Sequence, residues 1–317
     1  MWKSKYIFGP VPSRRLGRSL GIDLVPYKTC PFDCINCQLG RTTTKTMERK
    51  EYFSLDEIIG EVDRKLKENC AFDYITLSGS GEPTLHSRIG ELIEAIKKRT
   101  AKPLAVITNG SLLWDGDVRS ALMPTDVVVP SLDAGTQEYF EAVNRPCPGL
   151  RLDRVVDGLE AFSREFKGQM WLEVFLLGGM FDPRSRAREI AELTRRIRPT
   201  LIQLNTVARP PCESFAAPVP RDVMMELPPY FPGPTEVIAD FSVKWKNTVR
   251  PANREEILNL LSRRPCKSRD VAASLGIHHL EVLKVLEELV RERVLAVTEE
   301  NSETFYEVIT RNTEGQK

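Results

Sequence analysis

The sequence is poor in histidine and has no long run of apolar residues. Three histidines are present among 317 residues, and no apolar stretch approaches the roughly 18 residues that a membrane-spanning helix needs. The first residues, MWKSKYIFGPVPSRR, lack the apolar segment of a secretory signal. These absences argue against a membrane protein and against a secreted protein, and they predict a cytoplasmic location.

Charge is unevenly distributed along the chain. Hydrophobic residues make up 41% of the sequence and charged residues 28%, which suits a globular protein with one large core and an appendage. The net charge is +1, but residues 1–50 contain ten lysines and arginines against three acidic residues, whereas residues 252–317 contain ten against twelve. An anionic substrate or cofactor is therefore expected near the N-terminal part of the chain.

Three of the seven cysteines, Cys30, Cys34 and Cys37, lie within eight residues. The cytoplasm keeps thiols reduced, so this grouping indicates a metal or redox site rather than disulfides. Thiolates are soft ligands that suit iron–sulfur clusters and zinc. A cubane of four irons held by three cysteines keeps one iron open for a small molecule, to which it can pass an electron.

A zinc ion is the alternative that the Cys-x3-Cys-x2-Cys spacing leaves open. Structural zinc requires a fourth ligand to close its tetrahedron. The histidines, His86, His278 and His279, lie far from the three cysteines in sequence, and Cys70 is the one plausible fourth ligand. The spacing therefore favours a cluster without excluding zinc.

Six short apolar segments alternate with amphipathic helical segments in the first two thirds of the chain. A Ser54-x-x-Glu57 capping box opens the first helix, and the other main helical patterns begin near residues 87, 151 and 185. This alternation predicts an α/β fold in which parallel βα units wind into a partial (β/α)6 TIM-like barrel. The predicted strands are residues 19–24, 74–77, 104–108, 126–130, 170–177 and 201–204.

Polar loops follow these strands. The cysteine loop comes after the first strand, and the loops at 78–83, 108–110 and 131–133 come after the next three. The carboxyl ends of parallel strands lie on one side of the fold, and ligands bind there. The sequence therefore predicts one site built from these four loops.

The pattern changes after the sixth strand. Residues 209–234 are rich in proline and are expected to form an excursion over the barrel mouth with no buried element. Three short amphipathic helices and a hairpin then follow, which is the pattern of a winged helix-turn-helix domain. We predict a catalytic core at residues 1–210, a proline-rich linker at 211–250 and a winged helix-turn-helix domain at 251–317.

The cysteine loop, together with the segment Gly79-Ser-Gly-Glu-Pro83 after the second strand, resembles the radical S-adenosylmethionine (SAM) superfamily. The resemblance covers about residues 6–215. Four segments are also similar to a branch related to the wyosine-tRNA-forming enzymes, namely residues 9–23, Gln38-Leu-Gly-Arg-Thr42, Asn144-Arg-Pro146, and Gln203-Leu-Asn205 with Arg209-Pro-Pro211.

This resemblance implies two cofactors, a [4Fe–4S] cluster and SAM. Cys30, Cys34 and Cys37 would bind three irons and SAM the fourth. An electron from flavodoxin or ferredoxin would cleave SAM into methionine and a 5′-deoxyadenosyl radical that abstracts hydrogen from a substrate, with no catalytic side chain beyond the cluster and SAM. Family members usually have an aromatic residue near the adenine where this chain has Asn36, so that side-chain contact is not expected here.

The resemblance also implies the residues that contact SAM. Gly81 and Glu82 match the motif that receives its methionyl ammonium group. Asn109, Ser131 and Asp133 occupy positions that contact the ribose and the carboxylate in family members. The residues alone allow another interpretation, because Asn109 lies in a good turn sequence and Ser131 or Asp133 can cap the helix that follows.

The substrate is left open between a tRNA and a peptide or protein. Four basic residues, Arg14, Arg15, Arg18 and Arg41, can either face a tRNA or serve the structure. The expected recognition helix, residues 278–291, carries more acidic than basic side chains, which favours docking of a peptide or protein over DNA groove binding. The alternative to an enzyme is an iron–sulfur DNA-binding redox sensor, but a sensor has no need for a six-stranded barrel with a Gly-Glu-Pro loop.

Overall fold

Eight strands form one sheet in the computed structural model, which describes residues 4–68, 70–179, 181–238, 253–275, 277, 279–300 and 303–309. The first strand, β1, is antiparallel to its neighbour, and every other neighbouring pair in the sheet is parallel. In order across the sheet, the strands are β1 (Ile7–Ser13), β2 (Gly17–Ile22), β5 (Tyr74–Leu77), β6 (Leu104–Thr108), β7 (Val127–Pro130), β8 (Gln169–Leu176), β9 (Leu201–Thr206) and β10 (Thr235–Val237).

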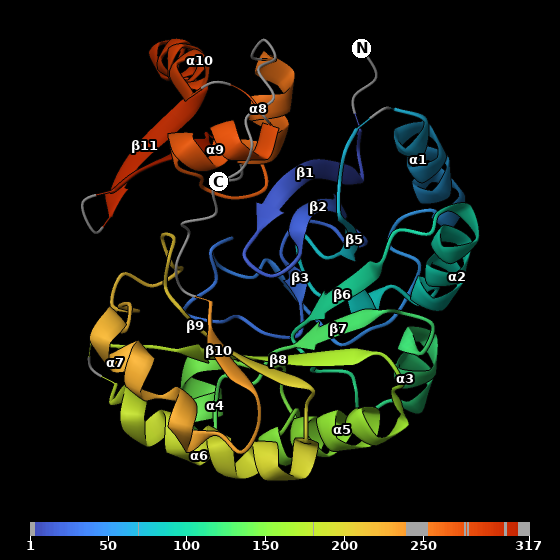
Figure 1. Cartoon of the computed structure of the whole chain (residues 1–317), viewed down its shortest axis with the longest axis vertical. Coiled ribbons are helices and arrows are strands. Elements are labelled where there is room, and N and C mark those ends of the chain that lie inside the picture. The colour runs from blue at the N-terminus through green and yellow to red at the C-terminus, as the bar shows by residue number, and fades with distance from the viewer. Residues whose placement is uncertain are drawn as a thin grey trace, which may run out of the picture.

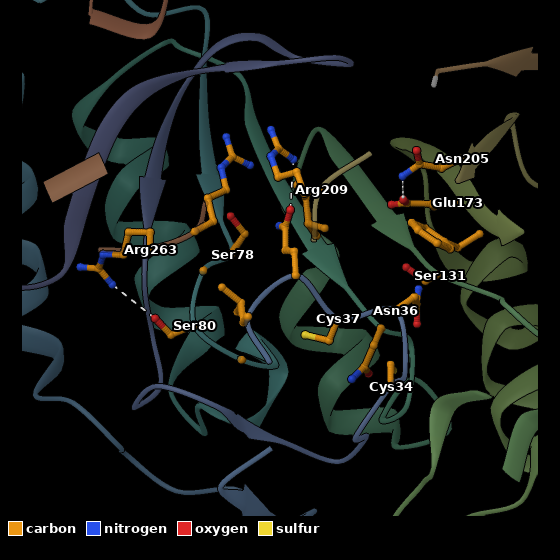
Figure 2. A pocket seen from close by; sticks show the side chains of 18 of the residues that line it. Cys34, Asn36, Cys37, Ser78, Ser80, Ser131, Glu173, Asn205, Arg209 and Arg263 are labelled. Carbon is orange, nitrogen blue, oxygen red and sulfur yellow. Dashed lines mark hydrogen bonds between the residues drawn. The ribbon is translucent and has the colours of Figure 1, made fainter. Parts of the chain in front are cut away.

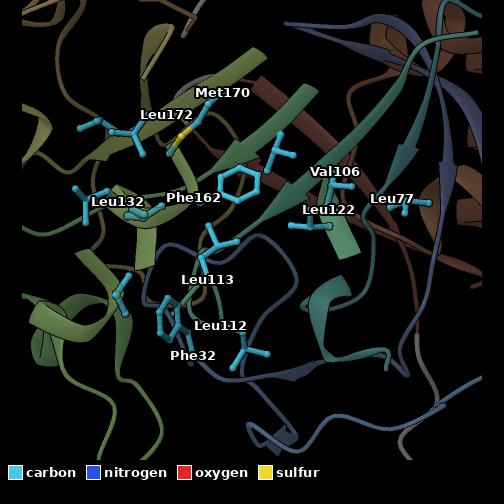
Figure 3. Packing of buried hydrophobic residues seen from close by; sticks show 14 of the residues in the cluster. Phe32, Leu77, Val106, Leu112, Leu113, Leu122, Leu132, Phe162, Met170 and Leu172 are labelled. Carbon is cyan, nitrogen blue, oxygen red and sulfur yellow. The ribbon is translucent and has the colours of Figure 1, made fainter. Parts of the chain in front are cut away.

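Helices cover the outer face of this sheet (Figure 1). Each is amphipathic, as α5 illustrates by burying Val155, Leu159 and Phe162 while its other face is polar. Figure 3 shows Phe162 among the side chains of this core, with Leu172 of β8. The helices of this layer are α1 (Leu55–Lys67), α2 (Ile89–Arg99), α3 (Gly116–Leu122), α4 (Gln137–Asn144), α5 (Leu152–Glu165), α6 (Pro183–Ile197) and α7 (Arg221–Glu226).

The six predicted parallel strands are confirmed as β2 and β5 to β9. The predicted Ser54 cap is also confirmed, since its side chain accepts a hydrogen bond from the backbone nitrogen of Glu57 at the start of α1. A capping box also predicts that the Glu57 side chain reaches back to the backbone N–H of Ser54. That part of the prediction is wrong, because the Glu57 carboxylate instead accepts a hydrogen bond from the Tyr6 hydroxyl group. Within the described ranges, no helix has the length and apolar content that a membrane span needs.

Two strands at the edges of the sheet were not predicted. The sequence of β1, IFGPVPS, has two prolines and a glycine, and such residues are tolerated in an edge strand because one side of it needs no ladder partner. At the other edge, β10 follows the proline-rich stretch and pairs with β9. The expectation that this stretch holds no buried element is wrong, because Leu227 and Phe231 belong to the main core.

The turn between β1 and β2 connects the two edges of the sheet. Arg14 donates to the side-chain oxygen of Asn205 on β9 at 2.6 Å and to the backbone oxygen of Ile238, directly after β10, at 3.2 Å. Its neighbour Arg15 forms an ion pair with Glu173 of β8 at 2.6 Å. The first and last parts of the sheet are therefore joined through arginine side chains.

The C-terminal part forms a second core that packs on β1. Val11 of β1 belongs to this core, and Phe8 packs against it. Residues 239–250 of the predicted linker lie outside the described residues, as do 251, 252, 276, His278, 301, 302 and 310–317 of the predicted winged helix-turn-helix domain. We refer to residues 253–309 as the C-terminal unit, and its elements are α8 (Arg254–Leu261), α9 (Ser268–Leu275), α10 (His279–Arg291), β11 (Leu295–Glu300) and β12 (Glu303–Val308), the last two paired as an antiparallel hairpin.

Replacement of Leu172 by alanine tests the packing of the main core. This side chain is fully buried in β8, so Leu172→Ala is expected to lower the free energy of unfolding by about 2–5 kcal/mol. Urea denaturation followed by circular dichroism measures the change. Met225, which is 59% exposed, provides the control, since Met225→Ala is expected to stay within about 0.5 kcal/mol of the wild type.

Candidate active site

A cavity of about 400 Å³ lies on the side of the sheet to which the polar loops belong, with part of its wall supplied by the C-terminal unit. Its size falls within the range of small-molecule and cofactor sites. Figure 2 shows side chains from several strands pointing into it. The structure brings together all eight residues that the sequence singled out, and they are Cys30, Cys34, Cys37, Gly81, Glu82, Asn109, Ser131 and Asp133.

The cysteine loop is fixed by apolar residues that alternate with the cysteines. Phe32 and Ile35 are buried in the main core, and Phe32 makes an edge-on contact with Phe140 of α4, with ring centroids 5.4 Å apart. The short strand β3 (Thr29–Cys30), at the start of the loop, pairs in parallel with β4 (Thr44–Lys45), which follows its end. The three thiols are thus carried on a loop that is anchored from both sides.

Each cysteine sulfur receives a hydrogen bond from a different side chain. The Lys28 ammonium nitrogen lies 3.1 Å from Cys37 Sγ, and the amide nitrogens of Asn109 and Asn144 lie 3.3 Å from Cys30 Sγ and 3.5 Å from Cys34 Sγ. Lys28 is 3% exposed, so its charge acts in a poorly screened environment. Such contacts suit thiolates, which carry negative charge.

Lys28 and Asn144 were not predicted as site residues. A lysine in an apolar setting two residues before the first cysteine is a signal that the sequence did carry. Asn144 is distant in sequence, and only the packing of α4 beside the cysteine loop places it there. Its other hydrogen bond, at 2.9 Å, goes to the Asp133 carboxylate, and it therefore links two parts of the site.

The donor set fits a cubane cluster with a bound ligand. Across the described ranges, no three His, Cys, Asp or Glu side chains are grouped closely enough to share one metal ion. A cubane does not require that grouping, because each cysteine binds its own iron at a separate corner. The side-chain oxygen of Asn36 is buried at the cavity and, within the described part of the chain, has no hydrogen-bond partner, so it can accept from a ligand.

Gly81 is required by the close approach of two loops. A Cβ atom at this position would lie 2.0 Å from the carbonyl oxygen of Thr29, beside the cysteines. The next residue, Glu82, donates its backbone N–H to that oxygen at 3.1 Å. The Gly-Glu-Pro loop is therefore bound directly to the cysteine loop.

The Glu82 carboxylate ties the loop after β5 to the end of β6. It is 2% exposed and accepts hydrogen bonds from Thr84, from the Thr108 hydroxyl group at 2.6 Å and from the backbone nitrogen of Asn109 at 2.7 Å. Burial raises its pKa above the usual range, while these donors oppose the rise. Oε2 accepts only from Asn109 among the hydrogen bonds of the described residues, which leaves it room for a donor from a ligand.

The turn interpretation of Asn109 has support and the cap interpretation of Asp133 does not. Asn109 Oδ1 accepts from the backbone nitrogen of Ser111 at 2.9 Å, while its amide nitrogen faces Cys30. The helix after Asp133 is capped by Thr136 instead, whose hydroxyl group accepts from the backbone nitrogen of Tyr139. Neither Ser131 nor Asp133 is therefore needed as a helix cap.

Burial raises the pKa of Asp133 to about 7.

Asp23, directly after β2, joins the Gly-Glu-Pro loop to the C-terminal unit. It accepts a hydrogen bond from the backbone nitrogen of Ser80 at 3.0 Å and another from the Ser80 hydroxyl group. Arg263, which follows α8, forms an ion pair with the same carboxylate and is 3.4 Å from the Ser80 hydroxyl oxygen. Figure 2 shows the Arg263 side chain beside Ser80. The C-terminal unit thereby supports the loop that carries Gly81 and Glu82.

The four arginines that suggested a tRNA surface make contacts within the protein. Arg14 and Arg15 bridge the sheet edges through Asn205 and Glu173, as described above. Arg18 pairs with Asp73 at 3.3 Å, and Arg41 pairs with Glu213 at 2.5 Å. These contacts favour the structural interpretation of the four side chains.

Residues 24–196 match the family model of the radical SAM superfamily. The match covers more than half of the chain and includes the three cysteines and the Gly-Glu-Pro loop. The chain therefore belongs to the radical SAM superfamily. It is an iron–sulfur enzyme whose cofactors are a [4Fe–4S] cluster and SAM, and enzymes of this class need an electron donor and a substrate. The metal cofactor of this superfamily is thus an iron–sulfur cluster rather than a zinc ion.

Several curated proteins are similar over most of the chain. It is 32% identical over 308 residues to UPF0026 protein MJ1312 from Methanocaldococcus jannaschii, covering 94% of each protein. It is 40% identical over 291 residues to a protein from Brachyspira hyodysenteriae named GTPase Obg, covering 91% of this chain and 43% of that protein. This chain thus spans less than half the length of the Brachyspira protein.

Solved structures share the fold. A radical SAM methyltransferase from Sphaerobacter thermophilus has a TM-score of 0.51 at 16% identity, covering 69% of this chain and 65% of that one. Streptococcus suis SuiB has a TM-score of 0.52 at 12% identity, covering 77% of this chain and 57% of that one. At these identities the likeness concerns the fold alone.

Breaking the contact between Arg263 and Asp23 is expected to destabilise the protein in a pH-dependent way. Burial raises the pKa of Asp23, and Arg263 opposes that rise. Without Arg263, ionisation of Asp23 weakens folding as the pH rises above the usual range of an aspartate. Arg263→Met is expected to lower the free energy of unfolding by about 3 kcal/mol at pH 8 and by much less at pH 4, where Asp23 is protonated.

Chemical denaturation at the two pH values measures this difference. Arg196 is a matched control, because it is 50% exposed and pairs with Asp157 and Glu160 on the outer surface. Arg196→Met is expected to cost less than about 1 kcal/mol at either pH. An equal loss at pH 4 and pH 8 for Arg263→Met would show that the ion pair is not what Arg263 contributes.

Proposed function

We propose that Cys30, Cys34 and Cys37 hold the [4Fe–4S] cluster and that the cavity beside them binds SAM for reductive cleavage. When bound, these cofactors supply one-electron cleavage of SAM to methionine and a 5′-deoxyadenosyl radical that abstracts hydrogen from a substrate. The observation that carries the proposal is that the three thiols line the same cavity as Gly81 and Glu82, each thiol within reach of a side-chain N–H donor.

The side chains around the cavity position the cofactors. We assign the methionyl ammonium group to Oε2 of Glu82, which has room for a donor, and the ribose and carboxylate to Asn109, Ser131 and Asp133. Asn36 offers a buried oxygen in the region where family members have an aromatic residue. No general acid or base among these residues is needed for the cleavage.

We interpret the two parts of the chain as a partial (β/α)6 barrel and a winged helix-turn-helix domain. The parallel order of β2 and β5 to β9, each followed by helical or loop excursions, supports the first interpretation. The order of three helices and an antiparallel hairpin in the C-terminal unit supports the second.

A cluster of this kind is stable to oxidation only in a reducing compartment, which supports a cytoplasmic location with flavodoxin or ferredoxin as electron donor.

The nature of the substrate stays a prediction, either a tRNA or a peptide docked by the C-terminal unit. The likeness to the wyosine-tRNA-forming branch rests on short segments of sequence. The intramolecular contacts of Arg14, Arg15, Arg18 and Arg41 weaken the argument for a tRNA surface. The acidic balance of α10 likewise weakens the alternative of a DNA-binding redox sensor.

Reconstitution tests the proposed reaction. The full chain, loaded anaerobically with iron and sulfide and supplied with SAM and dithionite, is expected to show a brown chromophore and to form 5′-deoxyadenosine. Cys34→Ala is expected to abolish the product, because the cluster loses one of three ligands. Liquid chromatography with mass spectrometry measures the 5′-deoxyadenosine. Cys70→Ala is the matched control and is expected to keep both the chromophore and the 5′-deoxyadenosine. Product from Cys34→Ala at the wild-type rate would refute the ligand assignment.

Removal of the Lys28 charge is expected to make the cluster harder to reduce. A cation beside Cys37 Sγ favours the more negative, reduced state. Lys28→Met is expected to lower the midpoint potential by about 60 mV, which for one electron corresponds to about 1.4 kcal/mol. A redox titration followed by electron paramagnetic resonance, without SAM, measures this. Lys98→Met, on the exposed face of α2, is expected to leave the potential unchanged.

A further inference from the structure

Arg263 is a charged side chain of the C-terminal unit that contacts the main core. It lies just after α8, its side chain is 19% exposed, and it forms an ion pair with Asp23. The same guanidinium group donates to the Ser80 hydroxyl oxygen at 3.4 Å and to the backbone oxygen of Lys5 at 3.2 Å, and its carbon lies 5.3 Å from the centroid of the Phe8 ring. One side chain thus connects the C-terminal unit with the segments around β1, β2 and β5.

Asp23 lies directly against the Gly-Glu-Pro loop. It is 3% exposed, and its carboxylate accepts hydrogen bonds from the backbone nitrogen and from the hydroxyl group of Ser80. A Cβ atom on Gly79 would lie 2.7 Å from Cγ of Asp23, so there is no room for a side chain between the loop and the carboxylate. Among the cationic side chains that the structure describes, Arg263 alone forms an ion pair with Asp23. The charge of Asp23 is therefore compensated from the C-terminal unit.

The position of Ser80 determines where the residues assigned to SAM lie. Its carbonyl oxygen accepts a hydrogen bond from the backbone nitrogen of Lys28 at 2.6 Å, in the segment that leads into the cysteine loop. Gly81 and Glu82 follow directly in the chain, and residue 81 fits against Thr29 only without a Cβ atom. A shift of Ser80 would therefore displace the Gly-Glu-Pro loop relative to the cysteines.

The charge of Asp23 makes this arrangement depend on its cation. An ionised carboxylate that is buried without a charge partner is strongly unfavourable, and access of water relieves it. Gly79 and Ser80 cover Asp23, so water reaches the carboxylate when the loop moves aside. An asparagine at position 23 would accept the same backbone hydrogen bond from Ser80 and would need no cation. The order of the loop is thus linked to Arg263 through the negative charge of Asp23.

We propose that Arg263 is a positioning residue for SAM binding, acting through Asp23 and Ser80 on the Gly-Glu-Pro loop. This inference rests on the proposed function, because it concerns the loop to which SAM is assigned. It goes beyond a stabilising role, since it makes the SAM affinity depend on a contact with the C-terminal unit. Coupling between binding free energies is reciprocal, so SAM also strengthens that contact. A molecule that binds the C-terminal unit and alters the contact then changes the SAM affinity without touching the cysteines.

Anaerobic titration with SAM tests the proposal. The reconstituted full chain is titrated at pH 8 without dithionite, so that SAM binds and is not cleaved, and calorimetry gives the dissociation constant. Arg263→Met is expected to raise this constant about ten-fold, which corresponds to a loop that is in place in about one molecule in ten. Arg263→Lys is expected to stay within about three-fold of the wild type, because its ammonium group still pairs with Asp23 and only weaker hydrogen bonds are lost.

The same replacement in an Asp23→Asn background separates this role from a structural one. The double variant leaves no buried carboxylate unpaired, so adding Arg263→Met there is expected to change the SAM dissociation constant by less than about two-fold. This comparison also decides the question where Arg263→Met alone does not fold. Arg254→Met is the matched control and is expected to bind SAM as the wild type does, because Arg254 pairs with Glu292 within the C-terminal unit. Iron and sulfide analysis checks that each variant carries the cluster.

Three results would overturn the proposal. An unchanged SAM affinity in Arg263→Met would show that Arg263 only stabilises the fold. An equal weakening by Arg263→Met in the Asp23→Asn background, or a loss in Arg263→Lys as large as in Arg263→Met, would show that Arg263 does not act through the charge of Asp23. Failure of the proposed function is read separately, as the absence of SAM binding and of 5′-deoxyadenosine from the wild type.

Discussion

Two backbone hydrogen bonds join the cysteine loop to the Gly-Glu-Pro loop, and the arrangement of the site depends on them. Lys28 donates its backbone N–H to the carbonyl oxygen of Ser80 at 2.6 Å, and Glu82 donates to that of Thr29 at 3.1 Å. The contact is possible because residue 81 has no Cβ atom. It holds the loop after β2 against the loop after β5, so the thiols and the Glu82 carboxylate occupy one cavity. Any larger residue at position 81 would have to separate these loops.

Buried charge organises the rest of the site. Glu82, Glu173 and Asp23 are all nearly inaccessible to solvent, and each is stabilised by donors from a distant segment. A buried carboxylate is stable only with such donors, so each of these residues fixes the relative position of the strands that supply them. The same physics explains why Arg14 and Arg15 hold the two edges of the sheet together.

The C-terminal unit is part of the site rather than a separate attachment. Its apolar core includes Val11 of β1, and its Arg263 reaches the Asp23 carboxylate that holds Ser80. A displacement of the unit would therefore remove the charge partner of Asp23, which holds Ser80 of the loop, and would open the part of the cavity wall that the unit supplies. This gives a physical route by which a molecule bound to the unit can influence the cofactor site, without any contact between that molecule and the cysteines.

The sequence by itself determined the six parallel strands, the cysteine loop and the Gly-Glu-Pro loop, because apolar periodicity and ligand spacing are local properties of the chain. It also predicted correctly that these loops share one side of the sheet, since parallel strands bring their carboxyl ends together. The edge strands β1 and β10 escaped prediction because their prolines and short length resemble loops, and an edge position tolerates both. Only the tertiary structure decided that Asn144 faces Cys34, that Arg263 meets Asp23, and that Arg15 pairs with Glu173. These contacts join residues up to 240 positions apart, and their geometry depends on how helices and sheet pack, which no local pattern encodes.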